Sequence, residues 1–234
     1  MIRFDRASKR YPNGREALSA ASFEIGAGEM VFLTGRSGAG KSTILKLISL
    51  LERPSRGLVM VNGHNTAALA ARRIPAFRRE LGVVFQDHRL LPDHSIFDNV
   101  ALPLHAAETG LTLKEIDKRV RAALDQVGLL DRARSLPLEL SVGEQQRVGI
   151  ARAVVVKPKL IIADEPTGNL DPALSLEVMS VFRRFNEVGV TVVIATHDLD
   201  IVHTWKLREI QVTDGKVSES GAAALELPAI EAQR

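Results

Sequence analysis

Short apolar runs alternate along the chain with stretches in which apolar side chains recur every three or four residues. Residues 30–33, 160–163 and 190–195 are mostly apolar and are bounded by turn residues, which is typical of buried strands. Residues 44–51 and 114–127 place apolar side chains at helical spacing, and in the second stretch charged residues lie between them. Strands that alternate with helices predict an α/β fold.

The two ends of the chain have different patterns. Residues 2–11 and 20–25 alternate in part and flank a Pro-Asn-Gly turn, so we expect two antiparallel strands there. Residues 207–218 carry an Asp-Gly pair between apolar positions, which predicts a hairpin. No such pattern continues beyond it. We therefore predict one folded domain over residues 1–218 and a flexible tail over residues 219–234.

A glycine-rich stretch lies between the first buried strand and the first helix. Residues 35–43 (GRSGAGKST) fit the phosphate-binding loop pattern G-x-x-x-x-G-K-[ST] at every fixed position. In this motif, backbone N–H groups and the helix N-terminus surround phosphate oxygens, the lysine binds the β- and γ-phosphates, and the next hydroxyl binds Mg²⁺. A chance glycine-rich turn is disfavoured because both flanks are correct. The predicted nucleoside-triphosphate site comprises Gly35, Ser37, Gly38, Ala39, Gly40, Lys41, Ser42 and Thr43.

Two carboxylates, Asp164 and Glu165, end the apolar strand that begins at residue 160. In a phosphate-binding-loop protein, an aspartate at a strand end completes the Mg²⁺ site. Glu165 would then lie near the γ-phosphate, where a carboxylate can act as general base on the attacking water. A solvated acidic strand end is the alternative, and the loop makes it the weaker one. His197 ends a later strand and is either a surface residue or a group that reaches the γ-phosphate.

Three further positions each support two interpretations. Gln86 ends a buried strand and is either a ligand of Mg²⁺ or water, or a strand cap. Tyr11 lies upstream of the loop and either stacks on a nucleotide base or packs as a strand residue; position alone favours packing. Ser141 and Glu144 have capping-box spacing, so a helix begins there. Its N-terminus is either a structural cap, which is favoured when the motif is taken alone, or an anion site.

Composition excludes several classes of protein. The chain has 234 residues, no cysteine and a net charge of +3, so disulfides and thiolate metal sites are excluded and no polyanion partner is required. Charges occupy the first six residues, where a signal peptide needs an apolar run, and no stretch reaches the roughly 20 apolar residues of a membrane helix. A membrane role therefore requires a partner. Residues 67–80 contain four arginines. Such a basic stretch can form a surface for an acidic partner or anionic lipid, but a solvated helix face is the more common case and the one we favour.

The order of these motifs is more specific than any one of them. The phosphate loop, Gln86, residues 140–145 (LSVGEQ), the Asp164-Glu165 pair and His197 together resemble the ATP-binding-cassette (ABC) ATPases over about residues 2–218. The resemblance implies a P-loop NTPase with a RecA-like core and an N-terminal antiparallel β subdomain. It also implies an inserted α-helical subdomain at about residues 88–155, with ATP as substrate and Mg²⁺ as the metal ion.

The resemblance also implies roles for the matched residues. Lys41 and the loop amides would hold the phosphates, and Tyr11 would stack on adenine. Ser42, Gln86 and Asp164 would form the metal site, with Gln86 also sensing a transmembrane partner. The remaining roles are those of Glu165, the general base, and His197, the switch on the γ-phosphate.

Other matched residues would act across a homodimer. Ser141 and Gly143 would bind the γ-phosphate held by a second copy, and residues 168–171 would meet their twin. Val142 departs from the family pattern, which has glycine at this position. A β-branched residue is costly if a positive φ is needed there, and it is harmless if its side chain points away from the phosphate. We expect the valine to be tolerated.

One branch of the family resembles this chain more than the others, namely the ATPases that act with a membrane protein in bacterial cell division. Residues 28–35, 85–91, 98–104, 148–154 and 185–192 carry the likeness. It implies an integral membrane partner, a peripheral position on the cytoplasmic face of the inner membrane and no nucleic-acid partner.

Other functions are weighed against this one. Relatives that release lipoproteins or export macrolides share much of the same sequence. A nucleotide-dependent scaffold with little turnover stays open because of Val142. Soluble members of the family that act on DNA or ribosomes are disfavoured, because they have two cassettes or a long coiled coil and this chain has one set of motifs.

Overall fold

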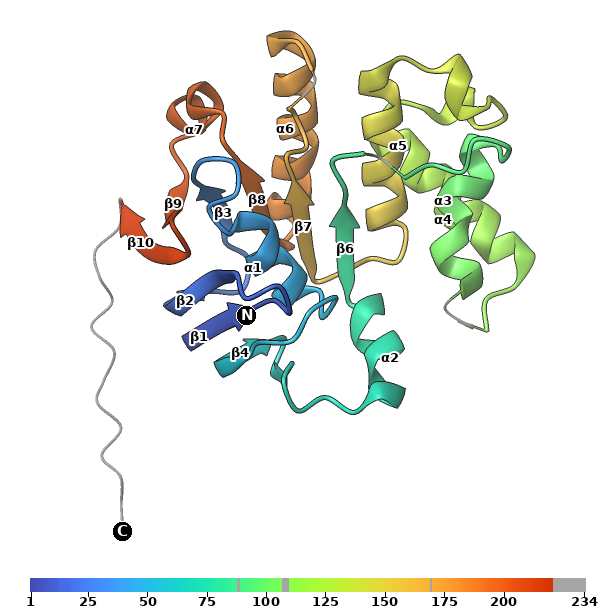
Figure 1. Cartoon of the computed structure of the whole chain (residues 1–234). Helices are drawn as coiled ribbons and strands as arrows, with labels where there is room; N and C mark the ends of the chain where they lie inside the picture. Colours follow the sequence, from blue (N-terminus) through green and yellow to red (C-terminus); the bar gives the residue numbers. More distant parts are fainter. Residues whose placement is uncertain (88, 107–109, 169, 221–234) are drawn as a thin grey trace.

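Two β-sheets with a helix between them form the part of the molecule that carries the phosphate-binding loop (Figure 1). The computed structural model describes residues 1–87, 89–106, 110–168 and 170–220. The main sheet has six strands. In spatial order they are β10 (Lys216–Ser220), β9 (Arg208–Thr213), β3 (Met30–Thr34), β8 (Thr191–Thr196), β7 (Leu160–Asp164) and β6 (Leu81–Val84).

The inner strands of this sheet are parallel and are buried on both faces. β3 lies between β8 and β9, and β7 lies between β8 and β6. Alternate side chains of β8 enter different cores: Ile194 packs with the helices on one face, whereas Val193 packs with the second sheet and α1 (Lys41–Ile48) on the other. Double burial explains why these strands are nearly continuous apolar runs in the sequence.

The second sheet is antiparallel and comes from the N-terminal part of the chain. Its strands in spatial order are β2 (Glu16–Ile25), β1 (Ile2–Arg10), β4 (Arg56–Val61) and β5 (His64–Asn65). Inward side chains such as Phe4 and Phe23, whose rings stack at 4.4 Å, cover α1 from the side opposite the main sheet. The phosphate-loop helix is thus held between two sheets.

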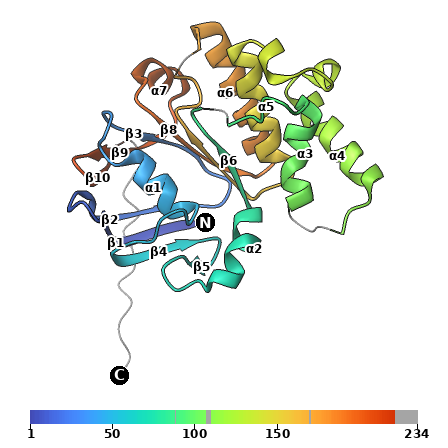
Figure 2. The same ribbon diagram turned by 45° about the vertical axis from the view of Figure 1, so that its right-hand side comes forward.

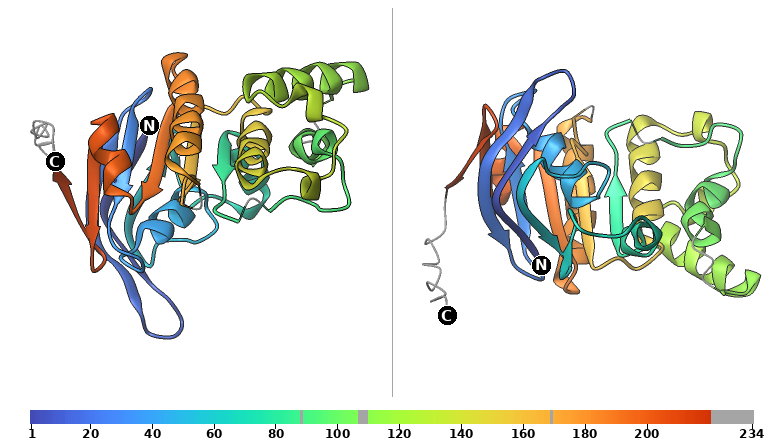
Figure 3. Two further views of the ribbon diagram at one scale, coloured as in Figure 1. Left: turned by 90° about the horizontal axis from the view of Figure 1, so that it is seen from above. Right: turned by 60° about the horizontal axis from the view of Figure 1, so that its bottom comes forward.

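Helices gather beyond β6 at one edge of the main sheet, as Figures 2 and 3 show. These are α3 (Ile96–Ala106), α4 (Leu113–Gln126) and α5 (Val142–Val154), of which α5 packs against β6. α6 (Pro172–Glu187) and α7 (Leu199–Trp205) contribute to the core on the Ile194 face, and α2 (Ile74–Arg79) lies beside β6. The short helical turns are Ala71–Arg73, Leu130–Arg132 and Pro137–Glu139.

The observed elements confirm the predicted α/β class and its N-terminal antiparallel sheet. One boundary needs correction. The domain end predicted at residue 218 falls inside β10, because Glu219 pairs with Ile210 and forms an ion pair with Arg208 at 2.9 Å. The remainder of the predicted tail, residues 221–234, lies outside the described residues. Within the described part of the chain, no helix is both long enough and apolar enough to cross a membrane.

Candidate nucleotide-binding site

The glycine-rich loop joins the end of β3 to the start of α1, and its glycines are required by geometry. Gly35 has φ +140°, and a Cβ at this position would overlap the carbonyl oxygen of Val212. Gly40 has φ +122°, and a Cβ there would lie 2.6 Å from the carbonyl oxygen of Ala17. Gly40 is also the N-cap of α1, and no side chain caps this end of the helix. The first helical N–H groups are therefore available to an anion.

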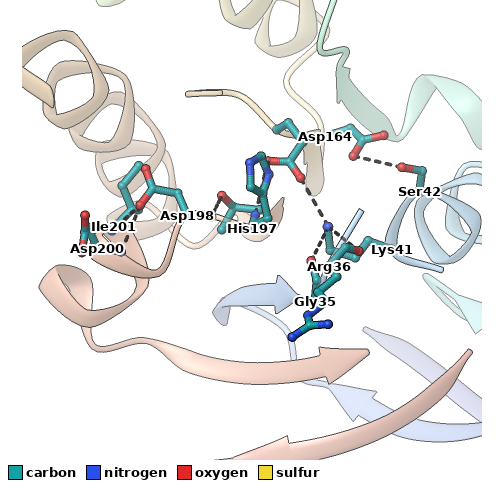
Figure 4. A network of polar contacts seen from close by, with 11 residues as sticks. Gly35, Arg36, Lys41, Ser42, Asp164, His197, Asp198, Asp200 and Ile201 are labelled. Carbon is teal, nitrogen blue, oxygen red and sulfur yellow. Dashed lines mark hydrogen bonds and ion pairs between the residues drawn. The ribbon is translucent and has the colours of Figure 1, made fainter. Parts of the chain in front are cut away.

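Lys41 is nearly buried, with 7% of its side chain exposed. Its ammonium group donates to the carbonyl oxygens of Gly35 at 2.6 Å and Arg36 at 3.4 Å (Figure 4). It also lies 3.4 Å from Oε1 of Glu165. The loop thus folds over the lysine and holds a positive charge beside the free amides of α1, which suits a polyphosphate.

Ser42 and Asp164 meet across the gap between α1 and β7. The serine hydroxyl donates to Oδ1 of Asp164 at 3.3 Å. Burial raises the pKa of Asp164 above its usual range; the Ser42 hydrogen bond opposes this shift and the adjacent Glu165 charge adds to it. A bound divalent cation would favour the ionised carboxylate. In the described part of the chain, no three His, Asp or Glu side chains gather as a metal cluster. One carboxylate and one hydroxyl nevertheless fit Mg²⁺, which takes its other ligands from phosphates and water.

Glu165 follows β7 in a left-handed conformation, with φ +49°. Its backbone N–H donates to the carbonyl oxygen of Ala195 at 2.9 Å. One carboxylate oxygen faces Lys41, and the other lies 2.8 Å from Nδ1 of His197 and accepts from the His197 backbone N–H at 3.3 Å. Only 11% of the Glu165 side chain is exposed, against 62% for His197. A strained backbone that aims a shielded carboxylate into a site is typical of a functional residue.

A cavity of about 400 Å³ brings together most of the predicted residues. It is lined by Tyr11, Ser37, Gly38, Gly40, Lys41, Ser42, Thr43, Gln86, Glu165 and His197. Gly35 and Ala39 face the other side of the loop. The Tyr11 hydroxyl lies 3.4 Å from Oγ1 of Thr43, and the Lys9 ammonium lies 5.2 Å from the Tyr11 ring centre. Tyr11 is thus placed at the mouth of the phosphate loop.

Two basic residues of this cavity were not expected from the sequence. Arg15 donates from Nη2 to the carbonyl oxygen of Gly38 at 2.8 Å, and Lys46 lines the cavity from α1. Arg15 follows a Pro-Asn-Gly turn, and nothing in the local pattern indicates that the turn folds back onto the loop. The helical spacing of Lys46 from Ser42, one turn away, was the only available signal.

The structure does not bring Ser141 and Gly143 into this cavity. They lie at the N-terminus of α5, where the Ser141 hydroxyl accepts from the Glu144 N–H at 3.3 Å. The Glu144 carboxylate accepts from the Ser141 N–H at 2.8 Å, and these Ser141 hydrogen bonds lower the pKa of Glu144. A Cβ at Gly143 would lie 3.0 Å from Cδ1 of Leu174. This geometry fits both interpretations of Ser141, a structural cap and an anion site, because a capping box still leaves Ser141 exposed at the helix N-terminus.

Val142 causes no backbone strain. It is the first residue of α5, its φ is not positive, and its side chain is 49% exposed. The harmless interpretation of this departure from the family pattern agrees with that geometry. Of the stretch 168–171, Asn169 lies outside the described residues, whereas Asp171 caps α6 by accepting from two backbone N–H groups at 3.0 Å.

Comparison with known proteins decides the family. The model of the family described as "ABC transporter" matches residues 18–168, which include the loop, the capping box and both carboxylates. The chain belongs to the ABC transporter family. It is an ATPase cassette, with ATP as substrate and Mg²⁺ as the usual ion of the family.

Relatives with known names cover nearly the whole cassette. The cell division ATP-binding protein FtsE of Escherichia coli (strain K12) is 54% identical over 92% of this chain and 96% of its own. FtsE of Bacillus subtilis (strain 168) is 48% identical over 92% and 93%. The ATP-binding cassette MJ0796, solved as a dimer in a post-hydrolysis state with ADP and Pi, has a TM-score of 0.85 and 36% identity over 94% and 97%.

Proposed function

We propose that this cassette is the ATP-hydrolysing subunit of a bacterial cell-division complex. Two copies would bind ATP between them and move an integral membrane partner resembling FtsX, from the cytoplasmic face of the inner membrane. The similarity to FtsE from two distant bacteria, at 54% and 48% identity, supports the cell-division assignment over the export alternatives. The observation that carries the ATPase assignment is the contact chain Lys41–Glu165–His197 beside the Ser42–Asp164 pair.

Each residue of that arrangement has a chemical task. Lys41 would exchange its contacts with Gly35 and Glu165 for the β- and γ-phosphates of ATP. Glu165 would then accept the proton of the attacking water, and His197 would hold the carboxylate in place. Ser42, Asp164 and Gln86 would hold Mg²⁺, whose charge offsets that of the phosphates during transfer. Tyr11 would stack on the base.

The position of α5 supports a dimer as the functional unit. Ser141 is exposed and lies outside the cavity that Lys41 lines, so it is available to a nucleotide on another copy; Gly143 also lies outside that cavity but is buried. MJ0796, which shares the fold at a TM-score of 0.85, is dimeric. ATP held between Lys41 of one copy and Ser141 of the other would stabilise the closed pair, and hydrolysis would remove that contact.

An apolar groove offers a place for the membrane partner. It measures about 380 Å³ and lies where α2, β6, α3 and α5 meet. Its walls are mostly apolar, with Leu51, Val83, Phe85 and Pro103, and three arginines stand among them: Arg78, Arg79 and Arg152. Phe85 is adjacent to Gln86, which lines the nucleotide cavity. We therefore place here a cytoplasmic segment of the membrane partner that carries apolar and acidic side chains.

Co-purification tests the partner. The tagged chain, isolated from detergent-extracted membranes, should bring down a protein with four predicted membrane spans, and Arg79→Glu should reduce its recovery at least tenfold, as roughly 1.4 kcal/mol of lost binding would. Arg72→Glu is the matched control, because Arg72 is an exposed arginine of the same basic stretch that does not line the groove. Recovery of a many-span exporter, or equal loss with both variants, would contradict the proposal.

A further inference from the structure

A short turn separates the nucleotide cavity from the apolar groove. We use the name Gln86 turn for Gln86, Asp87 and Arg89, which follow β6. Gln86 lines the nucleotide cavity, whereas the preceding residue, Phe85, lines the groove. The two cavities are therefore lined by adjacent residues of the backbone, Phe85 and Gln86.

The turn is held together by Arg89. Its guanidinium lies 4.2 Å from the centre of the Phe85 ring and donates from Nε to Asp87 at 3.0 and 3.3 Å. Its backbone has φ +49°, a conformation that a non-glycine residue adopts only when neighbouring contacts maintain it. These side-chain contacts join Arg89 to Asp87 and Phe85, which are its close neighbours in the sequence.

Arg152 supplies a tie to α5. It lies in the last turn of that helix, and its Nη1 donates to the carbonyl oxygen of Arg89 at 2.6 Å. Further along the chain, Asn99 of α3 is fully buried and bonds both the N–H and the carbonyl of Leu91, at 2.7 and 3.0 Å. Leu91 is thus anchored by α3, whereas Arg89, closer to Gln86, is held by α5.

We propose that Arg152 is a positioning residue: by holding the Arg89 carbonyl it sets the Gln86 amide in the nucleotide cavity and couples it to α5 and the groove. Its helix is capped by Ser141, so one rigid element connects the N-terminus proposed to meet a second copy with the turn that carries Gln86. The hydrogen bond has a charged donor and a short donor–acceptor distance of 2.6 Å, both of which are typical of the stronger hydrogen bonds in proteins. An occupant of the groove would touch Arg152 directly. The inference rests on the proposed role of Gln86 in the ATPase site.

Turnover kinetics test the coupling in the complex with the membrane partner. Arg152→Gln should lower kcat roughly tenfold and raise the Mg²⁺ concentration for half-maximal turnover severalfold, as expected for a lost charged hydrogen bond. The KM for ATP should stay within about twofold, because Lys41 and the loop amides are unchanged. Arg152→Lys, which keeps a charged donor, should recover part of the loss.

Arg184→Gln is the matched control for these kinetics. Arg184 of α6 also donates to a carbonyl on another element, that of Gln126 at 2.9 Å, but far along the chain from the Gln86 turn. An unchanged Mg²⁺ dependence in Arg152→Gln, or an equal loss in Arg184→Gln, would overturn the proposal.

Hydrogen exchange supplies a readout that does not depend on turnover. In the full chain, Arg152→Gln should speed exchange of the Arg89 N–H, which donates to the Asp87 carbonyl, roughly tenfold, while the N–H of Leu91, held by Asn99, keeps its protection. Equal exchange in wild type and Arg152→Gln would refute the contact itself. Absence of ATP turnover in the wild type would instead refute the proposed function, so the two failures are distinguishable.

Discussion

Replacing Glu165 by glutamine tests the chemistry of the site most directly. The change keeps the size of the side chain and removes the charge that lies 3.4 Å from Lys41 and 2.8 Å from Nδ1 of His197. A glutamine in this position can still bond to the histidine but cannot take a proton from water. Loss of a general base lowers turnover by about 10²–10⁴-fold, which raises the barrier by about 2.7–5.5 kcal/mol.

ATP binding should survive this substitution. Lys41 keeps its contacts with Gly35 and Arg36, and the loop amides are unaffected. Removal of a carboxylate near the γ-phosphate also removes a repulsion, so affinity should hold or increase. Because hydrolysis would open the proposed dimer, we expect Glu165→Gln to accumulate as an ATP-bound dimer that light scattering detects at saturating Mg²⁺-ATP.

The control for this experiment is Glu177→Gln. Glu177 is likewise paired with a cation, Arg147, but it lies on α6 and does not line the cavity. Phosphate release by Glu177→Gln should stay within about twofold of wild type, as is usual for a surface pair. Turnover by Glu165→Gln within threefold of wild type, or an equal loss in the control, would remove Glu165 from the role of base.

Two further predictions concern the loop and the metal site. Lys41→Ala should weaken ATP binding by roughly 10–100-fold in calorimetry, because charged hydrogen bonds contribute about 1.5–3 kcal/mol; wild-type affinity would contradict the phosphate role. Burial raises the pKa of Asp164 in the folded state above the unfolded value of 3.8. Below pH 3.8 the carboxyl is neutral in both states and costs the folded state nothing. As the pH rises through the folded pKa, the buried carboxylate becomes charged and the free energy of unfolding falls. Without Mg²⁺, Asp164→Asn should therefore be more stable than wild type in urea at pH 7 and should lose this difference near pH 3; an advantage independent of pH would refute the burial argument.

Local patterns predicted the elements that depend on neighbours in the chain. The apolar runs of β3, β7 and β8, the glycine loop and the capping box at Ser141 all appear where the sequence places them. The loop and the capping box have local signals: Gly35 and Gly40 have backbone angles that favour glycine, and Ser141 bonds a residue three positions away. Such features depend little on the rest of the molecule.

Contacts between distant parts of the chain could not be read in this way. Arg15 reaches Gly38, and Arg152 reaches Arg89 across 63 positions, without any periodicity that would reveal it. β10 extends to Ser220, beyond the predicted domain end at residue 218, because the polar residues Glu219 and Ser220 still pair with β9, and a pattern of apolar residues does not reveal such pairing. The backbone at Val142 also needed the structure, since its cost depends on φ alone.

The sequence by itself predicted the triphosphate loop from its local spacing, and the resemblance to the ABC ATPases implied the roles of metal carboxylate, base and switch histidine. Only the tertiary structure decided that Glu165 stands between Lys41 and His197 while Ser141 stands apart from their cavity. The physical reason is the order of the sheet: β3, β8 and β7 become neighbours only when two cores close on both faces, and that closure is a property of the whole chain.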